Sequence, residues 1–174
     1  MDDLPDFSKI KALLLDSDGI LTDGGVYIGT SGEQMRRFDI KDGLGLVRLQ
    51  RNGIPVGIIS ASPATPVLDR AKTLGIEHAY VGEKDKVGRA RSIAEAWKID
   101  LKDMAFMGDD LTDRPLLELV GTAITVADAA SIIRKSTAIQ YITQAPGGHG
   151  AVREVCDLIL GPELDASEAT PPSI

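Results

Sequence analysis

Short aliphatic runs alternate along the chain with segments in which apolar residues recur every three or four positions. The aliphatic runs predict strands, and because most of them are apolar at successive positions, the strands should be covered by helices on both faces. The expected strands are 11–16, 55–60, 78–81, 104–108 and 122–126, with a further short strand at 138–143. This alternation predicts an α/β fold with a doubly wound, Rossmann-like parallel sheet.

The segments between the strands have the spacing of amphipathic helices. Apolar side chains recur at helical intervals from Val87 to Trp97 and from Val152 to Ile159. Three more helices are expected at 42–52, 63–74 and 113–120. Each of these segments is followed directly by a glycine, which is a common residue just past the end of a helix.

Residues 25–38 interrupt the alternation with two short extended pieces around a Gly-Thr-Ser-Gly turn, which predicts a small inserted β-hairpin. A two-stranded hairpin is marginally stable alone, so it should pack against another subunit. The insertion is too small for a cap domain. We therefore expect a single domain at 10–160, with an N-terminal extension at 1–9 and a disordered tail at 161–174.

The composition and net charge of the chain exclude several classes of binding partner and cellular location. The 174 residues carry a formal net charge of −7, which argues against nucleic acid or an anionic membrane surface as a partner. The sequence contains neither an apolar run long enough to span a bilayer nor a signal peptide, so a cytoplasmic protein is expected. The single cysteine, Cys156, excludes an internal disulfide framework and lies among apolar residues at helical spacing, which favours a buried core thiol.

Polar side chains follow four of the expected strands, where they should meet at one edge of the sheet. Two carboxylates about 4 Å apart repel by roughly 4 kcal/mol at an effective dielectric constant near 20, so such a cluster requires a cation. Carboxylate oxygens without nearby His or Cys favour Mg²⁺. In chain order, the residues are Asp16, Asp18, Ser60, Lys86, Asp109, Asp110 and Asp113.

The spacing of Asp16 and Asp18 suits phosphoryl transfer. Asp16 can attack phosphorus and form an aspartyl phosphate, while Asp18 protonates the leaving alcohol and then deprotonates water. Asp16, Asp109 and the main-chain carbonyl of Asp18 are expected to hold Mg²⁺. Ser60 and Lys86 should hold the phosphate oxygens. The predicted function is a Mg²⁺-dependent phosphomonoesterase, with Asp110 and Asp113 supporting the site.

Each of these features also has an ordinary structural explanation. An isolated D-x-D-G sequence is typical of a turn, Ser60 could cap the next helix, and Lys86 could be a solvated surface residue. The acidic residues from Asp109 to Asp113 could form the first turn of a helix. The placement of all four elements at strand ends of one sheet favours the functional interpretation.

With these residues identified, the sequence resembles the haloacid dehalogenase superfamily of Mg²⁺-dependent phosphatases. The resemblance covers roughly residues 9–161 and consists of Asp16-x-Asp18-Gly19, Ser60, Lys86 and Gly108-Asp109-Asp110 in that order. Within the superfamily, the chain is similar to the small cap-less 3-deoxy-D-manno-octulosonate 8-phosphate phosphatases. GILTDG at 19–24, KDGLG at 41–45 and GGHGAVREVCD at 147–157 support that similarity.

The resemblance implies a phosphorylated sugar acid as substrate, a homotetramer in which the hairpins associate, and a place in lipopolysaccharide precursor synthesis. It also implies substrate contacts at Asp39, Ile40, Lys41, Asp42, Gly43 and Arg70. Three residues depart from the family pattern: Ser62, Val47 and His149 stand where the family commonly has arginine. Arginine suits a carboxylate or phosphate better than serine or valine does, so these departures bear on the exact substrate.

Two other classes of protein remain open from the sequence. A phospho-receiver signalling domain also places acidic residues, Ser or Thr, and Lys at strand ends, but its lysine comes last, whereas Lys86 precedes Asp109. A non-catalytic sugar-phosphate-binding oligomer could share the fold, and the presence of both Asp16 and Asp18 counts against it.

Overall fold

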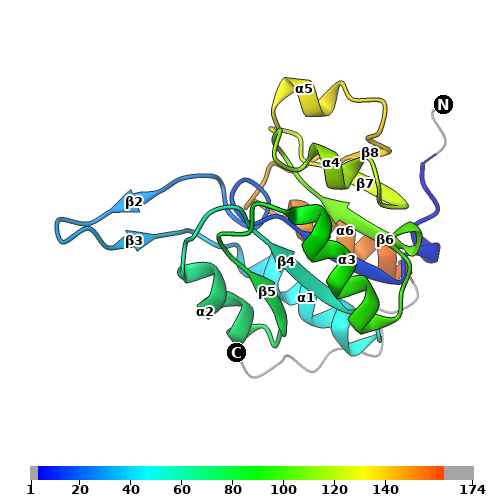
Figure 1. The fold of residues 1–174 in the computed structure, drawn as a ribbon, viewed down its shortest axis with the longest axis horizontal. Coiled ribbons are helices and arrows are strands. Elements are labelled where there is room, and N and C mark those ends of the chain that lie inside the picture. Colours follow the sequence, from blue (N-terminus) through cyan, green and yellow to red (C-terminus); the bar gives the residue numbers. More distant parts are fainter. Residues whose placement is uncertain (1–3, 163–174) are drawn as a thin grey trace.

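The computed structural model describes residues 4–162, which form an α/β fold around a six-stranded sheet (Figure 1). Every neighbouring pair in the sheet is parallel, and the spatial order is β5-β4-β1-β6-β7-β8. The strands are β1 (Ala12–Leu15), β4 (Val56–Ile59), β5 (His78–Tyr80), β6 (Met104–Met107), β7 (Thr122–Thr125) and β8 (Tyr141–Ile142). The predicted doubly wound parallel sheet is confirmed.

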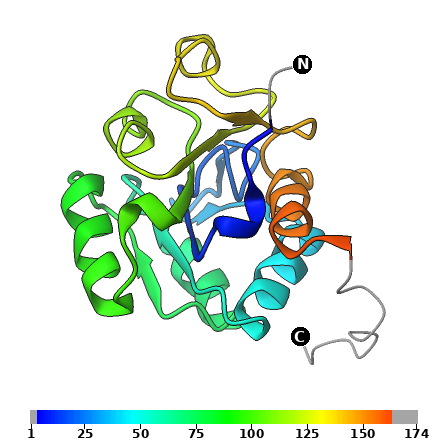
Figure 2. The same cartoon turned by 90° about the vertical axis from the view of Figure 1, so that its right-hand side faces the viewer.

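Helices cover both faces of this sheet (Figure 2). Side chains of β1 alternate between two buried clusters: Leu13 and Leu15 face α1, α2 and α6, whereas Ala12 and Leu14 face α3 and α4. Burial on both sides explains why β1 is apolar at every position. The helices are α1 (Ile40–Arg51), α2 (Pro66–Thr73), α3 (Lys86–Trp97), α4 (Arg114–Leu117), α5 (Ser131–Arg134) and α6 (Ala151–Leu160), with short 3₁₀ turns η1 (Phe7–Lys9) and η2 (Leu101–Asp103).

The observed helix bounds differ from the predicted ones at residues that control helix ends. Helix α1 begins at Ile40 rather than at residue 42, because the Asp39 carboxylate accepts a hydrogen bond from the Lys41 N–H and caps the helix. Helix α2 begins at Pro66, a residue that favours the first helical turn. Helix α4 spans four residues instead of the expected 113–120, and α5 was not predicted because four residues show no periodicity.

The predicted hairpin is present as β2 (Tyr27–Ile28) and β3 (Gln34–Met35), with Tyr27 opposite Met35. It extends away from the sheet and its helices (Figure 1). Tyr27, Ile28 and Met35 are 55%, 70% and 57% exposed, so the hairpin presents apolar side chains to solvent. No further inserted domain occurs between residues 4 and 162.

Helices α1 and α6 pack closely against each other. Cys156 is buried between them, as predicted, and an added Cβ at Gly45 would press against its side chain. Phe7 in the expected N-terminal extension is also buried and packs edge-on against the ring of Tyr141. The expected tail at 161–174 lies almost wholly outside the described residues, and the domain boundaries stay a prediction. None of the helices in the described part is long and apolar enough to cross a membrane.

Candidate active site

The carboxyl ends of β1, β4 and β6 meet where the chain connections diverge to opposite sides of the sheet. From β1 the chain continues to β4 on one side, and from β6 it continues to β7 on the other. Ligands of open parallel sheets bind at such a point. A cavity of about 270 Å³ opens there and brings Asp16, Asp18, Ser60 and Asp109 together.

Lys86, the first residue of α3, contacts two carboxylates of this site. Its Nζ lies 3.0 Å from Oδ1 of Asp16 and 2.6 Å from Oδ1 of Asp113. The Lys86 side chain is only 3% exposed, so it is not the solvated surface lysine that the sequence also allowed. A buried ammonium is stable only when it is paired, and here two carboxylates pair with it.

Asp113 joins the lysine to the loop that follows β6. While Oδ1 of Asp113 contacts Lys86, its Oδ2 accepts hydrogen bonds from the backbone N–H groups of Asp109 and Asp110, at 2.9 and 3.2 Å. Asp113 is completely buried. The side chain of Asp110 is turned toward its own loop and accepts a hydrogen bond from the Leu111 N–H. Asp113 therefore holds the geometry of the loop that carries Asp109.

Burial and neighbouring charges raise the pKa of two carboxylates in the cluster, Asp16 and Asp109. Burial, together with the charge of Asp113, raises the pKa of Asp16 to about 7, although Lys86 opposes that shift. Burial and the charges of Asp113, Asp16 and Asp110 likewise raise the pKa of Asp109 to about 7. Burial disfavours the charged form of Lys86, yet the charges of Asp16 and Asp113 raise its pKa overall. The site has more negative charge than one lysine balances.

This donor set fits a hard divalent cation. Asp16, Asp109 and Asp113 each offer an oxygen, and these oxygens lie within 4.8 Å of one another. Both oxygens of Asp113 already have partners, so Asp16 and Asp109 are the carboxylates available to Mg²⁺. Gly19 leaves the space that Asp109 occupies, since an added Cβ would overlap the Asp109 carboxylate. The expected main-chain ligand at Asp18 stays a prediction.

Two further polar side chains, Ser60 and Arg36, lie near the carboxylates of this site. Ser60 is 1% exposed, and its Oγ has no hydrogen-bond partner among the described residues although it borders the cavity. Arg36, just after β3, places its Nε 3.1 Å from Oδ1 of Asp18. No pattern in the sequence indicates a role for Arg36, because its position depends on how the hairpin returns to the sheet.

None of the six residues expected to contact substrate is part of the lining of this cavity. The Asp42 carboxylate is occupied elsewhere, because it accepts hydrogen bonds from the Gly150 and Arg153 N–H groups at the start of α6. Arg70 donates to the Asp39 carbonyl and lies against Gly43, where an added Cβ would overlap its guanidinium. Ile40 and Lys41 are exposed. Substrate contact by these six residues stays a prediction.

The three positions that depart from the family pattern have different surroundings. Ser62 lines the cavity, Val47 packs against the hydrophobic core, and His149 is exposed. Of these, Ser62 alone borders the cavity.

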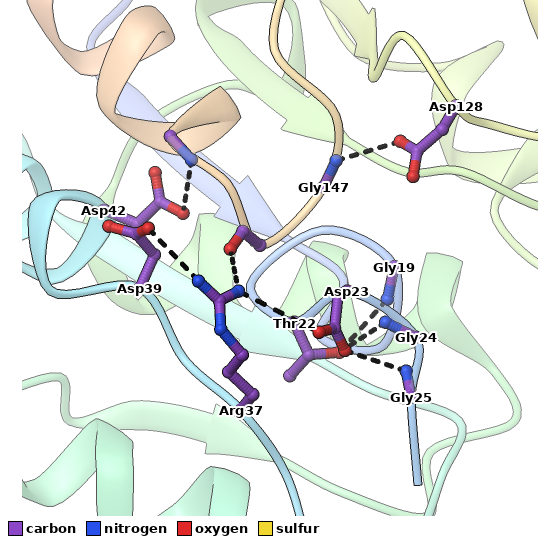
Figure 3. A network of polar contacts seen from close by, with 12 residues as sticks. Gly19, Thr22, Asp23, Gly24, Gly25, Arg37, Asp39, Asp42, Asp128 and Gly147 are labelled. Carbon is purple, nitrogen blue, oxygen red and sulfur yellow. Dashed lines mark hydrogen bonds and ion pairs between the residues drawn. The ribbon is translucent and has the colours of Figure 1, made fainter.

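A network of polar contacts connects the loop after β1 to the loop before α6 (Figure 3). The hydroxyl of Thr22 accepts hydrogen bonds from the Gly19 and Gly24 N–H groups and so closes the first loop. Arg37 donates to the Gly148 carbonyl at 2.7 Å and lies 3.9 Å from the carboxylates of Asp23 and Asp39.

The loop before α6 reaches this network through two glycines. The Gly147 N–H donates to Asp128, and an added Cβ at either Gly147 or Gly148 would overlap the backbone of residues 19–23. These glycines thus allow the two loops to lie in direct contact.

Comparison with known proteins identifies the family. Residues 81–150 match the family of haloacid dehalogenase-like hydrolases. Over 166 residues, the chain is 40% identical to the 3-deoxy-D-manno-octulosonate 8-phosphate phosphatase KdsC of Escherichia coli K12, and the match covers 95% of this chain and 87% of the relative. The chain belongs to the 3-deoxy-D-manno-octulosonate 8-phosphate phosphatase family.

Solved structures of this family have the same fold. The Yersinia pestis 3-deoxy-D-manno-octulosonate 8-phosphate phosphatase is 40% identical, with a TM-score of 0.84 over 88% of this chain and 82% of that one. The phosphatase from Moraxella catarrhalis, in complex with magnesium ion, phosphate ion and KDO, is 37% identical, with a TM-score of 0.84 over 89% of this chain and 88% of that one. Magnesium thus occurs in a relative of similar fold, in agreement with the donor set found here.

Proposed function

We propose that this protein hydrolyses 3-deoxy-D-manno-octulosonate 8-phosphate, or a closely related sugar-acid phosphate, as a Mg²⁺-dependent phosphomonoesterase. The observation that carries the proposal is the convergence of Asp16, Ser60 and Asp109 at one cavity, with Lys86 paired to Asp16, in a chain of this family. Mg²⁺ held by Asp16 and Asp109 would neutralise charge on the phosphoryl oxygens.

The first chemical step forms a covalent intermediate on Asp16. A carboxylate oxygen of Asp16 attacks phosphorus, and the bond between phosphorus and the sugar oxygen breaks with its electron pair left on that oxygen. Asp18 gives its proton to the departing oxygen, so the sugar leaves as a neutral alcohol. Lys86 stabilises the ionised form of Asp16, which is the reactive form.

The second step releases phosphate. Asp18, now ionised, accepts a proton from water while the water oxygen bonds to phosphorus, and the bond from phosphorus to Asp16 breaks. The Ser60 hydroxyl, which has no partner among the described residues, is available to donate to a phosphate oxygen. Lys86 supplies positive charge next to Asp16.

The alternative functions have less support. A receiver domain would keep its phosphoryl group, whereas Asp18 lies beside Asp16 and has a carboxylate suited to activating water. A binder would not need a nucleophile held against a buried lysine. The resemblance in sequence and fold to named phosphatases also favours the enzyme.

We also propose a homotetramer assembled through the hairpins, and a cytoplasmic enzyme of lipopolysaccharide precursor synthesis. The exposed apolar side chains of Tyr27, Ile28 and Met35 support the assembly, because apolar patches on an isolated ribbon favour burial by another subunit. Light scattering tests it: Ile28→Lys should reduce the molar mass below that of the wild type. A wild-type monomer would contradict the assembly without affecting the chemistry.

The experiment that tests the function measures phosphate release from 3-deoxy-D-manno-octulosonate 8-phosphate and from a hexose 6-phosphate, which has no carboxylate. We expect Mg²⁺-dependent turnover of the sugar acid, abolished in Asp16→Asn and retained in the control Asp103→Asn, which removes an exposed carboxylate at the opposite, amino-terminal end of β6. Ser62 lines the cavity where the family commonly has arginine, so the preference for a substrate with a carboxylate has to be measured. The ratio of kcat/KM for the two esters gives this preference. Stoichiometric labelling without turnover would contradict the proposal.

A further inference from the structure

The hairpin contributes one side chain to the reaction centre. Arg36 immediately follows β3, and its Nε donates to Oδ1 of Asp18 at 3.1 Å. Its Nη1 donates to the Met35 carbonyl at 3.3 Å and lies 3.4 Å from Oε1 of Gln34. The guanidinium is therefore held by the end of the hairpin on one side and by Asp18 on the other.

The environment of Arg36 is unusual for an arginine on an extended loop. Its side chain is only 4% exposed, whereas the apolar side chains of the neighbouring strands are largely exposed. Removing a guanidinium from water is unfavourable unless the charge is paired, so a flexible arginine would otherwise stay in solvent. Pairing with Asp18 accounts for its burial.

The pairing uses only one of the two Asp18 oxygens. Within the described residues, Oδ2 of Asp18 has neither a hydrogen bond nor an ion pair, and Asp18 lines the cavity together with Asp16. A carboxylate held by one oxygen keeps a single orientation and leaves the other oxygen available. The contact with Arg36 therefore orients the Asp18 carboxylate.

We propose that Arg36 is a positioning residue that holds Oδ1 of Asp18 and thereby presents Oδ2 to the reacting ester. This inference rests on the proposed function, in which Asp18 exchanges a proton with the departing oxygen and with water. It also makes the orientation of Asp18 depend on the base of the hairpin, because Arg36 lies in the chain directly after β3.

The test compares two esters that differ in their need for an acid. A sugar phosphate has a strongly basic leaving oxygen that must be protonated, whereas p-nitrophenolate departs without a proton. The ratio kcat/KM reports the steps up to departure of the leaving group. We expect Arg36→Met to lower kcat/KM for the sugar phosphate on the order of tenfold to a hundredfold, as partial loss of general acid catalysis would, and to lower that for p-nitrophenyl phosphate far less.

Three further variants separate positioning from other roles. Arg36→Lys should restore kcat/KM to within about threefold of wild type, because a single-point contact does not need the guanidinium fork. Arg36→Met should cause no further loss in an Asp18→Asn background. Arg89→Met removes a similar pair, Nε to Glu83 Oε2 at 2.8 Å, outside the cavity and should leave both esters unaffected.

Equal losses on the two esters, or an additive loss in the Asp18→Asn background, would overturn the positioning role and indicate that Arg36 acts on the substrate or on the fold. Failure of the proposed function gives a different result. In that case the wild-type protein would release phosphate from neither ester, which would overturn both proposals.

Discussion

Lys86 and Asp113 form a buried ion pair in which Nζ of the lysine lies 2.6 Å from Oδ1 of the aspartate. The pair connects the start of α3 to the loop after β6, because Asp113 also accepts backbone hydrogen bonds from that loop. The lysine proposed to hold phosphate and the loop that carries Asp109 are therefore positioned by one side chain. The pair should matter for stability as well as for catalysis.

Replacing Lys86 by methionine should destabilise the protein. Asp16 and Asp113 would then be buried without their cation, and breaking a buried pair costs about 3–5 kcal/mol. Lys11→Met is the matched control, since its pair with Asp103 is 63% and 41% exposed and should contribute less than about 1 kcal/mol. Urea unfolding of both variants measures the loss of unfolding free energy in each. Similar losses would show that burial does not make the Lys86 pair more important for stability than the exposed Lys11 pair.

Stability should depend on pH in a direction set by the raised pKa values of Asp16 and Asp109. Each has a folded-state pKa of about 7 against an ordinary value of 3.8, so the folded state binds more protons than the unfolded state between these pH values. Without Mg²⁺, the contribution of these groups to the free energy of unfolding therefore falls as pH rises from about 4 to about 7. Above that range it should be constant.

The free energies of unfolding of the wild type and of Asp109→Asn, measured in EDTA across this range, isolate the contribution of Asp109. The wild type should lose stability relative to the variant as pH rises, since the amide does not titrate. Added Mg²⁺ binds the ionised carboxylates, so its stabilisation of the wild type should be larger at pH 8 than at pH 6. A difference between the proteins that is independent of pH would contradict the assigned shifts.

Gly148→Ala should both destabilise the protein and lower its activity. Gly148 has a φ of +66°, which costs an L-residue about 1–2 kcal/mol, and the added methyl would also overlap the backbone of Thr22 and Asp23. Gly53→Ala is the control, because Gly53 has a φ of +77° with nothing within 4 Å of an added Cβ. Thermal unfolding should show a larger loss of stability in Gly148→Ala than in Gly53→Ala. Only Gly148→Ala should lower kcat. Equal effects would show that backbone strain alone is responsible.

Ser17 and Ser60 are a matched pair of buried hydroxyls without hydrogen-bond partners among the described residues. Replacing either by alanine removes an unsatisfied polar group and should leave the free energy of unfolding unchanged or raise it by about 1 kcal/mol. Ser60 borders the cavity, so Ser60→Ala should also raise KM for the phosphate ester. Steady-state kinetics of Ser17→Ala should match the wild type. A normal KM in Ser60→Ala would remove that hydroxyl from phosphate binding.

Much of the fold and the acidic cluster could be predicted from the sequence, because both follow from simple geometry. Apolar strands covered on both faces have an unmistakable pattern, and the carboxyl ends of parallel strands meet at one edge. This rule predicts that Asp16, Ser60 and Asp109 lie close together, and all three line one cavity. Short elements such as α5 carried too few residues for a periodic signal.

The contacts that the sequence did not indicate are those between segments far apart in the chain. Arg36 meets Asp18 because of the path by which the hairpin returns, and no local pattern encodes that path. The Asp42 carboxylate accepts hydrogen bonds at the start of α6, more than a hundred residues later. Neither the charge of a side chain nor its spacing indicates which distant backbone it will contact.

The contact of Gly147 and Gly148 with the loop after β1 has a consequence for protein synthesis. A ribosome makes Asp16, the proposed nucleophile, more than a hundred residues before it makes these glycines. Until these glycines have been made, the loop after β1, which lines the cavity, lacks the surface against which it rests. We therefore expect activity to begin only after α6 has left the exit tunnel and the loop before it has packed against the loop after β1.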